Sequence, residues 1–382
     1  MHKVVHITTV HNPLDTRIYY KMCETVANND FELFYIVKEH NDLKKIVERS
    51  NFHLRVLKKP RGRFSRMLKT AVEALKVAKK LDADIYHIHD PELLWVGSLL
   101  KTKHNIVIYD VHEDYETSIK QKKYIYKPFR KVIASIFNVY EKTMSRKMEK
   151  CLAEKYYSNK FPNGKHILNY PILNEASRLQ DQSSNSNTQT DHKIRLIYTG
   201  TVGLDRGALN HAKLTTFDDN FEITSVGKCP YLLAEKIYNT AGEYKKNIQM
   251  VGVEEYIPRN VIDEYYLKNN WVAGLALFPH TKHYEQKELT KFFEYMSFGI
   301  PILCSDFPVW KKFIDKHQCG ISVNPENEAE IKEAIYYLVK NPKEAKKMGE
   351  NGKKAIAAEL NWEFEGKKLI DWYDQLIDNR RK

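Results

Sequence analysis

The sequence predicts an α/β protein made of two doubly wound, Rossmann-like parallel sheets, and two observations carry this prediction. Short apolar runs rich in Val, Ile and Tyr alternate with helix-length periodic segments along almost the whole chain. This alternation is typical of parallel sheets that helices cover on both faces. Near the midpoint, residues 179 to 190 form a polar run with one apolar side chain. Such a run adds nothing to a core and predicts a linker between two domains that face a central cleft.

The length and composition agree with this architecture. The chain has 382 residues and a mass of 45.0 kDa, which fits two or three domains. With 42% apolar and 29% charged residues, it is neither collagen-like nor low-complexity nor disordered. We place the first domain at residues 1 to 178, the linker at 179 to 192 and the start of the second domain at 193.

The elements of the first half follow from periodicity and from β-branched and aromatic enrichment. Strands are expected at residues 3–10, 32–37, 54–57, 84–88 and 106–109. Helices are expected at about residues 16–28, 66–80 and 128–147. In the second half the expected strands are residues 195–198, 222–225, 247–251, 272–278, 301–304 and 321–323. From residue 327 onward the pattern is helical, with breaks at Asn341-Pro342 and Asn361-Trp362.

The cysteines and the N-terminus indicate a reducing compartment. Five cysteines are scattered without a C-x-x-C pair (Cys23, Cys151, Cys229, Cys304 and Cys319), so neither a disulfide framework nor a zinc site is predicted. No segment has the design of a signal peptide, and nowhere do eighteen apolar residues run together. We expect a cytoplasmic protein whose membrane contact, if any, is peripheral.

The basic excess of the chain lies entirely in its first half. Residues 1 to 190 hold 33 basic and 21 acidic side chains, whereas the remainder holds 28 of each, for a formal net charge of +12. Residues 58 to 80 carry nine Lys or Arg against one Glu, and residues 120 to 150 carry ten against two. These two segments could hold the first domain at an anionic membrane surface. The alternative is that their apolar stripes face the core while their lysines are solvated.

Ligands of open parallel sheets bind where strands end at their carboxyl side, so the loops there are the candidate sites. The first such loop, residues 11 to 18, contains His11, Asp15 and Arg17. It could hold an acceptor substrate or a phosphate. The alternative is that Asp15 caps the following helix and Arg17 is solvated.

A second loop follows the strand at residues 106–109 and contains His112. A histidine at this place can donate to a sugar hydroxyl or phosphate, or move a proton. A structural hydrogen bond is the alternative. A metal site built from His87, His89 and His112 is conceivable, but no ligand pair has helical spacing, and no metal is predicted.

Two further loops carry glycine and charge. Residues 199 to 207 contain Gly200, Gly203 and Arg206, a pattern that suits close approach of a diphosphate. The alternative for Arg206 is an exposed residue in the first turn of a helix. Further on, Lys291 and Glu294 lie at i and i+3 on a predicted helix, where they could meet a phosphate and a ribose or simply pair with each other.

Residues 291 to 308 closely resemble the donor-site motif of glycosyltransferase family 4, also called glycosyl transferases group 1, whose members are retaining enzymes of the GT-B fold. The resemblance extends over most of the chain. Further matching segments are residues 11–18, 84–90, 110–113, 198–207, 251–253 and the tail motif from Asn341-Pro342 to Asn361-Trp362.

The resemblance implies a role for each matching residue. Glu294 resembles the glutamate that binds the ribose, and Arg206 and Gly200 resemble the residues that hold the donor diphosphate. His112 resembles the histidine that contacts the donor sugar. The turn Gly252-Val253 borders the base. Residues 193 to 363 are then the nucleotide-sugar domain, the loop with His11, Asp15 and Arg17 lies on the acceptor side, and the helix at about 364 to 382 returns to the first domain.

The chain departs from the family pattern at three places. The spacing E-x7-E would need Glu at 286, and the chain has Gln286 with Glu285 and Glu288 beside it. Thr201 stands where arginine is common, so we expect Lys291 to supply the second diphosphate cation. The N-terminal loop lacks the common double glycine.

The resemblance implies transfer of a sugar from a nucleotide-sugar, with a UDP-sugar as the expected donor, to a glycan or lipid-linked acceptor. Arg206, Lys291 and His112 are the expected catalytic residues, and no cofactor is expected. Asp82-Ala83-Asp84 spells the D-x-D of metal-dependent transferases but precedes a strand, so we interpret it as a surface turn. The alternatives are a nucleotide-sugar epimerase and a non-catalytic binding protein. No nucleic-acid module is present, so nucleic acid is not an expected partner.

Overall fold

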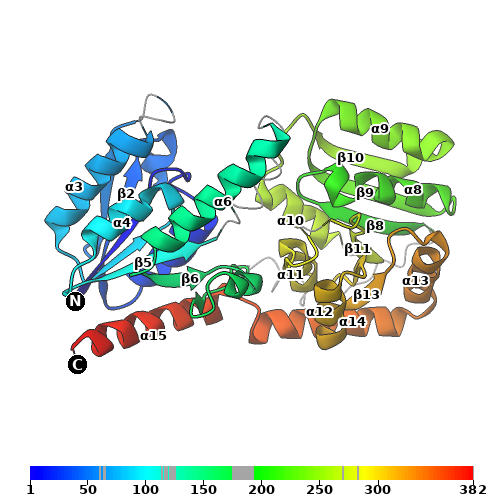
Figure 1. Ribbon diagram of the computed structural model, residues 1–382. Helices are drawn as coiled ribbons and strands as arrows, with labels where there is room; N and C mark the ends of the chain where they lie inside the picture. The colour runs from blue at the N-terminus through cyan, green and yellow to red at the C-terminus, as the bar shows by residue number, and fades with distance from the viewer. Residues whose placement is uncertain are drawn as a thin grey trace. The chain divides into compact units, whose positions relative to one another are not determined.

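The computed structural model describes the chain except residues 60–61, 63–65, 113–114, 116–118, 120–125, 174–192, 269–270, 282–283 and 382. It divides into two compact units. The N-terminal unit is Met1–Asn169 with Trp362–Lys382, and the C-terminal unit is Tyr170–Asn361. Both units are parallel sheets with helices on their faces (Figure 1). The predicted linker, residues 179 to 192, lies outside the described residues.

The sheet of the N-terminal unit has seven strands in the order β3-β2-β1-β4-β5-β6-β7, all paired in parallel. Their bounds are β1 His2–Thr8, β2 Phe31–Lys38, β3 Phe52–Leu57, β4 Ile85–Ile88, β5 Ile106–Val111, β6 Glu149–Leu152 and β7 Lys165–His166. The strand order reverses between β1 and β4. In an open sheet this switch point is where ligands bind, beyond the carboxyl ends of the strands.

The sheet of the C-terminal unit has six strands in the order β10-β9-β8-β11-β12-β13, again parallel. Their bounds are β8 Ile194–Thr199, β9 Phe221–Cys229, β10 Ile248–Val253, β11 Ala273–Ala276, β12 Ile302–Ser305 and β13 Gly320–Val323. Here the order reverses between β8 and β11. The loop that follows β8 therefore opens at the switch point of this unit.

The helices of the N-terminal unit cover both faces of its sheet. A π-helical segment η1 (Thr16–Cys23) continues into α1 (Glu24–Ala27), and η3 (Arg66–Thr70) continues into α3 (Ala71–Leu81). The others are α4 (Leu94–Leu100), α6 (Lys127–Met144) and α15 (Trp362–Arg381). Short 3-10 turns occur at η2 (Asn41–Lys45), η4 (Pro91–Leu93) and η5 (Lys155–Asn159).

Helices also flank the sheet of the C-terminal unit. They are α8 (Ala208–Lys213), α9 (Tyr231–Ala241), α10 (Arg259–Leu267), α11 (Thr290–Ser297), α12 (Pro308–His317), α13 (Glu328–Lys340) and α14 (Pro342–Ala358). The 3-10 turns of this unit are η7 (Leu204–Arg206), η8 (Leu214–Thr216) and η9 (Gly242–Asn247). Prolines at the first turns of α12 and α14 are compatible with helix starts, because those positions need no N–H partner.

The chain returns to the N-terminal unit at its C-terminal end, through α15. Leu369, Trp372, Tyr373 and Ile377 of this helix are at most 7% exposed and join the same apolar cluster as β1, β2 and β5. Tyr373 also lies edge-on to Phe31, with ring centroids 6.0 Å apart. The last helix is therefore part of the core of the first unit.

The apolar stripes of the two basic segments face the core only in part. Met67 and Leu68 of η3 are 42% and 63% exposed, and Ile133 and Ile136 of α6 are 41% and 64% exposed. In α3 the buried positions are three alanines, Ala71, Ala74 and Ala78. Small side chains let a helix lie close to the sheet, so larger residues one position away face outward.

The amino edge of the N-terminal sheet contains the D-x-D sequence. Asp82 ends α3 in a left-handed conformation with φ of 44°. Asp84 accepts a hydrogen bond from the backbone N of Lys3 (3.1 Å) and from Arg380 (2.7 Å). Its carboxylate thus joins β1 and α15 at the edge opposite the ligand-binding one, in agreement with a structural turn. No helix among the described residues is both long and apolar enough to cross a bilayer.

Candidate functional site

The loop after β8 is shaped by two glycines. Gly200 has φ of +86°, a region that L-residues with a side chain rarely adopt, and a Cβ there would lie 2.8 Å from the Nζ atom of Lys291. On the neighbouring strand, a Cβ on Gly227 would lie 2.1 Å from the carbonyl oxygen of Gly200. The two backbones therefore approach each other at the carboxyl edge, and the Lys291 ammonium group occupies the space that a side chain at 200 would fill.

Two cations flank Tyr198 at this loop. The Lys291 Nζ atom lies 4.7 Å from the centroid of the Tyr198 ring. Arg206, on η7, donates from Nε to the Tyr284 hydroxyl (3.2 Å) and from Nη1 to the carbonyl of Thr201 (3.4 Å). Both cations are predicted from the sequence. In the structure both lie at the loop after β8, where Lys291 contacts Tyr198 and Gly200 and Arg206 contacts Thr201.

The positive charge of this loop is not neutralised by contact. Among the described residues, neither Lys291 nor Arg206 forms an ion pair with a carboxylate. Burial lowers the pKa of Lys291 to about 8; Glu294 opposes this shift, and Arg206 adds to it. The Lys291 ammonium and the Arg206 guanidinium thus lie beside the Gly200 turn, at the switch point of the sheet. Two such cations at a glycine turn suit a phosphate or diphosphate.

Glu294 lies in a network that the sequence did not indicate. Its Oε1 accepts from Arg259 of α10, and its Oε2 accepts from the Tyr266 hydroxyl at 3.0 Å. Arg259 also donates to Asp263 (2.8 Å). The alternative in which Glu294 simply pairs with Lys291 is not realised, because the two side chains engage different partners. Arg259 is a lone arginine after a proline, and no local pattern distinguishes it.

The remaining predicted donor residues lie at the end of β10, in the loop after β8 and in the segment before α11. Gly252 and Val253 end β10 in an irregular turn, where Gly252 has φ of +104°. Thr201 is exposed, as is Gln286. Glu285 and Glu288 are half-buried. Glu288 accepts a hydrogen bond from Tyr170 at 3.4 Å, within the same unit.

The acceptor-side residues lie at the carboxyl end of β1. Asp15 accepts from the backbone N–H groups of Arg17 (2.9 Å) and Ile18 (3.0 Å), so it does cap the helix. Arg17, however, is not solvated. It is 4% exposed, and its guanidinium binds both oxygens of Asp110 at 2.7 to 3.2 Å. The guanidinium of Arg17 is therefore held against Asp110 in the interior of the unit.

Asp110 also organises the histidines of this unit. Its Oδ2 accepts from His89 Nδ1 (3.0 Å) and lies 3.1 Å from His112 Nδ1. His89 Nε2 is 2.9 Å from His6 Nδ1, and Tyr373 of α15 connects His6 to His87. Burial, with a neighbouring histidine, holds the pKa of His6 and of His87 well below the ordinary value. His6 and His87 are therefore neutral. Their hydrogen bonds lead through Tyr373 and His89 to Asp110.

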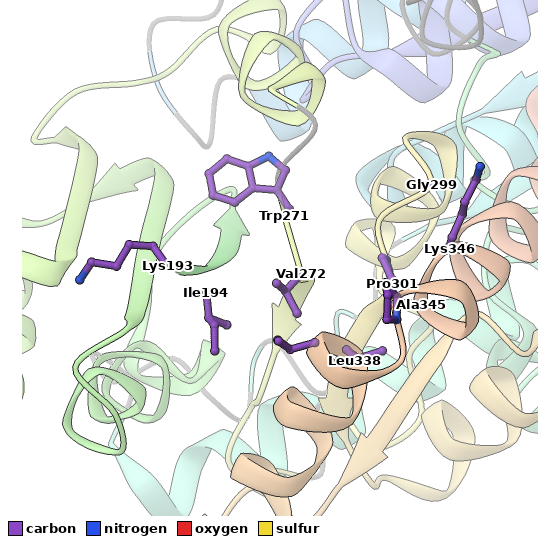
Figure 2. Close-up of a pocket in the computed structure, with 11 residues that line it drawn as sticks. Lys193, Ile194, Trp271, Val272, Gly299, Pro301, Leu338, Ala345 and Lys346 are labelled. Atoms are coloured by element: carbon purple, nitrogen blue, oxygen red, sulfur yellow. The ribbon is translucent and has the colours of Figure 1, made fainter. Parts of the chain in front are cut away.

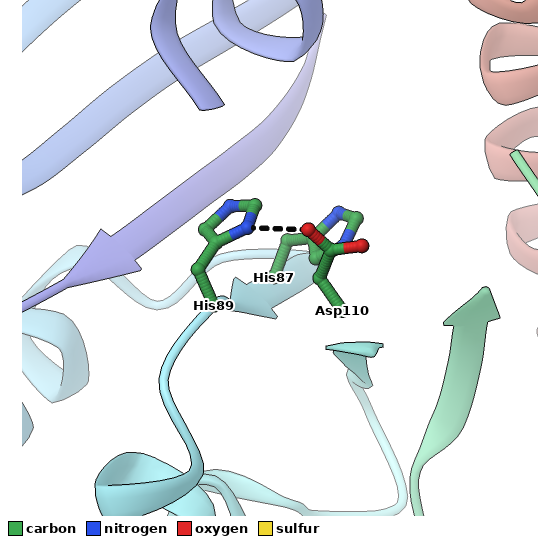
Figure 3. Close-up of side chains that lie close together, drawn as sticks. All are labelled: His87, His89 and Asp110. Atoms are coloured by element: carbon green, nitrogen blue, oxygen red, sulfur yellow. Dashed lines mark hydrogen bonds and ion pairs between the residues drawn. The ribbon is translucent and has the colours of Figure 1, made fainter. Parts of the chain in front are cut away.

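Three of these side chains, His87, His89 and Asp110, bring potential metal ligand atoms within 4.8 Å of one another (Figure 3). Their chemistry does not suit a cation. Asp110 is already bound by the Arg17 guanidinium, and both nitrogens of His89 are engaged, which leaves only His87 Nε2 without a partner. A metal here would have to displace Arg17, whose charge it would also face at short range.

A pocket of about 460 Å³ lies at the other edge of the C-terminal sheet (Figure 2). It is lined by Val272 and Pro301, which precede β11 and β12, and by Lys193, Trp271 and Lys346. These are amino ends of strands, opposite the loop that carries Gly200. None of the predicted site residues lines this pocket.

Comparisons with known proteins agree with this fold. Residues 233–355 match the model of the family described as glycosyl transferases group 1. Sucrose-phosphate synthase from Thermosynechococcus elongatus superposes with a TM-score of 0.72 at 17% identity, covering 99% of this chain and 100% of that one. HepE from Anabaena, solved with UDP, gives 0.70 at 9% identity over 98% and 100%. WaaG, a glycosyltransferase involved in lipopolysaccharide biosynthesis, gives 0.62 at 13% over 96% and 98%. No curated protein sequence matches the chain.

These findings confirm the predicted GT-B fold of two Rossmann-like parallel-sheet domains, and residues 233–355 of the C-terminal unit match the model of glycosyl transferases group 1. The matched segment includes Glu294, Lys291 and Gly252. The narrower assignment to family 4 stays a prediction.

Proposed function

We propose that this protein is a retaining glycosyltransferase that moves a sugar from a nucleotide diphosphate donor, a UDP-sugar, to a lipid-linked or cell-surface glycan. The observation that carries the proposal is the pair of cations, Lys291 and Arg206, beside the Gly200 turn at the switch point of the C-terminal sheet. The group 1 match of residues 233–355 and the UDP and UDP-glucose named for the similar HepE structures support a uridine diphosphate donor.

The proposed donor site assigns one task to each group. Arg206 and Lys291 bind the diphosphate, and Gly200 lets the backbone approach it. Glu294 accepts hydrogen bonds from the ribose hydroxyls, with Arg259 holding its carboxylate in place. The turn at Gly252 and Val253 borders the base.

The proposed reaction is front-face departure of the diphosphate, with the acceptor hydroxyl entering from the same side. The enzyme then accelerates the reaction by stabilising charge on the leaving group. Removing one preorganised donor of this kind costs about 3 to 4 kcal/mol, or two to three decades in rate. Because the two cations can neutralise the leaving diphosphate, we expect turnover without an added metal or cofactor.

The N-terminal unit is proposed to lie peripherally on the inner face of an anionic membrane. Five apolar side chains of α6 are exposed, Phe129 (59%), Val132 (54%), Ile133 (41%), Ile136 (64%) and Val139 (66%). The basic residues of the segments 58–80 and 120–150 add attraction of about 1 kcal/mol for each one close to the surface. Exposed apolar side chains combined with positive charge are typical of helices that lie in the interface. A lipid-linked or anionic acceptor would be found at such a surface.

The test is an assay with a panel of nucleotide sugars and a membrane extract, which measures free UDP and labelled lipid or glycan. We expect UDP release that depends on the extract and falls at least a hundredfold in R206A and in E294A. K354A, which changes an exposed lysine of α14, is the matched control and should behave as wild type. If the donor sugar is converted to an epimer without acceptor, the protein is an epimerase. If a nucleotide sugar binds without any product, it is a binding protein.

A further inference from the structure

His11 and His112 meet at the carboxyl edge of the N-terminal sheet, and each is backed by a buried carboxylate. Their Nε2 atoms are 3.1 Å apart. His11 Nδ1 lies 2.7 Å from Asp90 Oδ1, and His112 Nδ1 lies 3.1 Å from Asp110 Oδ2. Asp90 and Asp110 are at most 1% exposed. The arrangement is a chain of carboxylate, imidazole, imidazole and carboxylate.

Asp90 is ionised and fixes a proton on His11. Burial alone would raise its pKa, but hydrogen bonds from His11 and from the backbone N–H groups of Thr9 and Val10 lower it to about 2. The Thr9 N and Val10 N atoms lie 2.5 and 3.1 Å from Oδ2. All of these groups favour the charged carboxylate. The nitrogen of His11 that faces it at 2.7 Å must therefore be the protonated one.

The carboxylate of Asp110 faces His112 without a hydrogen bond. Arg17 and His89 hold the pKa of this carboxyl well below its ordinary value in spite of burial. The contact from His112 Nδ1 to Oδ2 lacks hydrogen-bond geometry, but a bare nitrogen lone pair at 3.1 Å from an ionised oxygen would be repelled. The Nδ1 atom of His112 thus carries a proton as well.

The two Nε2 atoms then face each other with no proton left for either neutral ring. A neutral imidazole has one N–H and one lone pair, so two neutral rings that are both protonated at Nδ1 would place two lone pairs 3.1 Å apart. We propose that His11 and His112 share one additional proton between their Nε2 atoms, so that the pair is a monocation. His11 is then a positioning residue that sets the charge and orientation of His112.

Among Arg17, the histidine pair and the two buried carboxylates, the charges balance with this proton. Arg17 and the histidine pair contribute two positive charges against Asp90 and Asp110, whereas two neutral histidines would leave one buried negative charge uncompensated. His89 is neutral, because its Nδ1 donates to Asp110 and its Nε2 accepts from His6. The other described charged groups of this edge are Asp15, Lys21, Lys38 and Glu92.

The catalytic consequence rests on the proposed function. A cationic pair at the switch point of this unit can stabilise negative charge or donate to a sugar hydroxyl in a way that one neutral histidine cannot. The proton itself is a property of the folded unit. It can be measured without donor or acceptor. The shared proton can therefore be absent while the proposed function is correct, and it can be present while the proposed function is wrong.

The test is nitrogen NMR of the full chain labelled with ¹⁵N-histidine at pH 7.5, without substrate, with the His11 and His112 signals assigned from H11N and H112N. We expect both Nδ1 atoms to be protonated and the two Nε2 atoms to share one proton, seen as shifts between the protonated and bare positions. In H11N the remaining His112 should change to an ordinary neutral ring, whereas H104N, which removes an exposed histidine, should leave the pair unchanged. Two bare Nε2 atoms, or a bare Nδ1 on either ring, would overturn the proposal.

A second measurement separates charge from shape. H11Q keeps a side-chain N–H that can donate to His112 but removes the shared proton. If the charge matters, kcat falls about tenfold or more in both H11Q and H11F, while KM for the nucleotide sugar stays within about twofold. Recovery of wild-type kcat in H11Q would show that His11 acts by shape alone.

Discussion

The environment of Lys291 disfavours the charged form of this side chain in the folded protein. Its pKa falls from 10.5 to about 8 because it is buried and Arg206 is near. A depressed lysine pKa means that folding opposes the charged form. The cost is fully present below about pH 8 and disappears as the pH rises through 10.5. A shift of this size corresponds to about 3 kcal/mol.

K291M should therefore stabilise the protein while it abolishes donor binding. We expect a gain of about 2 to 3 kcal/mol in the free energy of unfolding at pH 7, which shrinks to nothing near pH 10.5. Urea unfolding at both pH values measures it, with K354A as the control. Destabilisation by K291M at pH 7 would show that the ammonium is satisfied by partners in the folded protein.

Binding of a diphosphate should raise the pKa of Lys291 and draw in a proton. At pH 8 the free ammonium is about half protonated, so binding should take up about half a proton per site. Calorimetric titrations with UDP in buffers of different ionisation enthalpy measure this uptake. It should disappear in K291M, and an uptake that persists there would assign the proton to another group.

At the residue scale, the sequence allows a prediction where a role follows from local spacing, and these roles stay predictions. Gly200, Arg206 and Lys291 could be found because a glycine turn after a strand and a basic residue at the next helix start have a meaning in the sequence itself. Arg259 and Asp90 could not, because their partners lie far along the chain. Glu294 is 35 residues from Arg259, and His11 is 79 residues from Asp90. Arg17 could be read from the sequence as solvated, since nothing nearby indicated its burial against Asp110.

At the scale of elements, α15 shares the apolar core of the N-terminal unit with its strands. Trp372 is 7% exposed within the cluster that includes β1 and β2, whereas Phe364 on the same helix is 47% exposed. W372A should lower the free energy of unfolding by about 3 to 5 kcal/mol, and F364A by about 0.5 kcal/mol or less. Urea unfolding compares the two. Equal effects would mean that α15 is only loosely docked.

The exposed face of α6 predicts membrane binding that depends on apolar contact as well as on charge. Replacing both Ile136 and Val139 with Ser should lower partitioning onto phosphatidylglycerol vesicles more than tenfold, because each apolar side chain contributes about 1.5 kcal/mol or more when buried. The matched control is L232S, which changes an exposed leucine of α9. Sedimentation with vesicles measures the difference. If the double variant binds as wild type does, the face has another role.

Element prediction was most successful for the strands buried on both faces. Each predicted strand coincides with an observed one. A strand that helices cover on both faces of a parallel sheet is buried on both sides, and a continuous run of Val, Ile and Tyr suits such a strand. β6 and β7 were missed. Glu149–Leu152 contains two charged residues in four, and Lys165–His166 has only two residues, so neither shows an apolar run. The alternative that the apolar stripes of the basic segments face the core holds for Ala71 and Ala78 of α3. It does not hold for Met67 and Leu68 of η3 or for Ile133 and Ile136 of α6, because spacing identifies a stripe but not which part of it the sheet covers.

At the scale of the whole molecule, the basic excess lies in the first half of the sequence, whereas the second half holds equal numbers of basic and acidic side chains. The proposed donor site lies in the C-terminal unit, with Arg206 and Lys291 beside the Gly200 turn. The proposal therefore predicts that the affinity for a diphosphate depends on these two cations.

A calorimetric titration of UDP into wild type, R206A and K354A tests this dependence most directly. We predict that UDP binds wild type and K354A with the same affinity, and that R206A binds at least a hundredfold more weakly, since a charge-assisted contact to the diphosphate is lost. Equal affinity of R206A and wild type for UDP would contradict the proposed donor site.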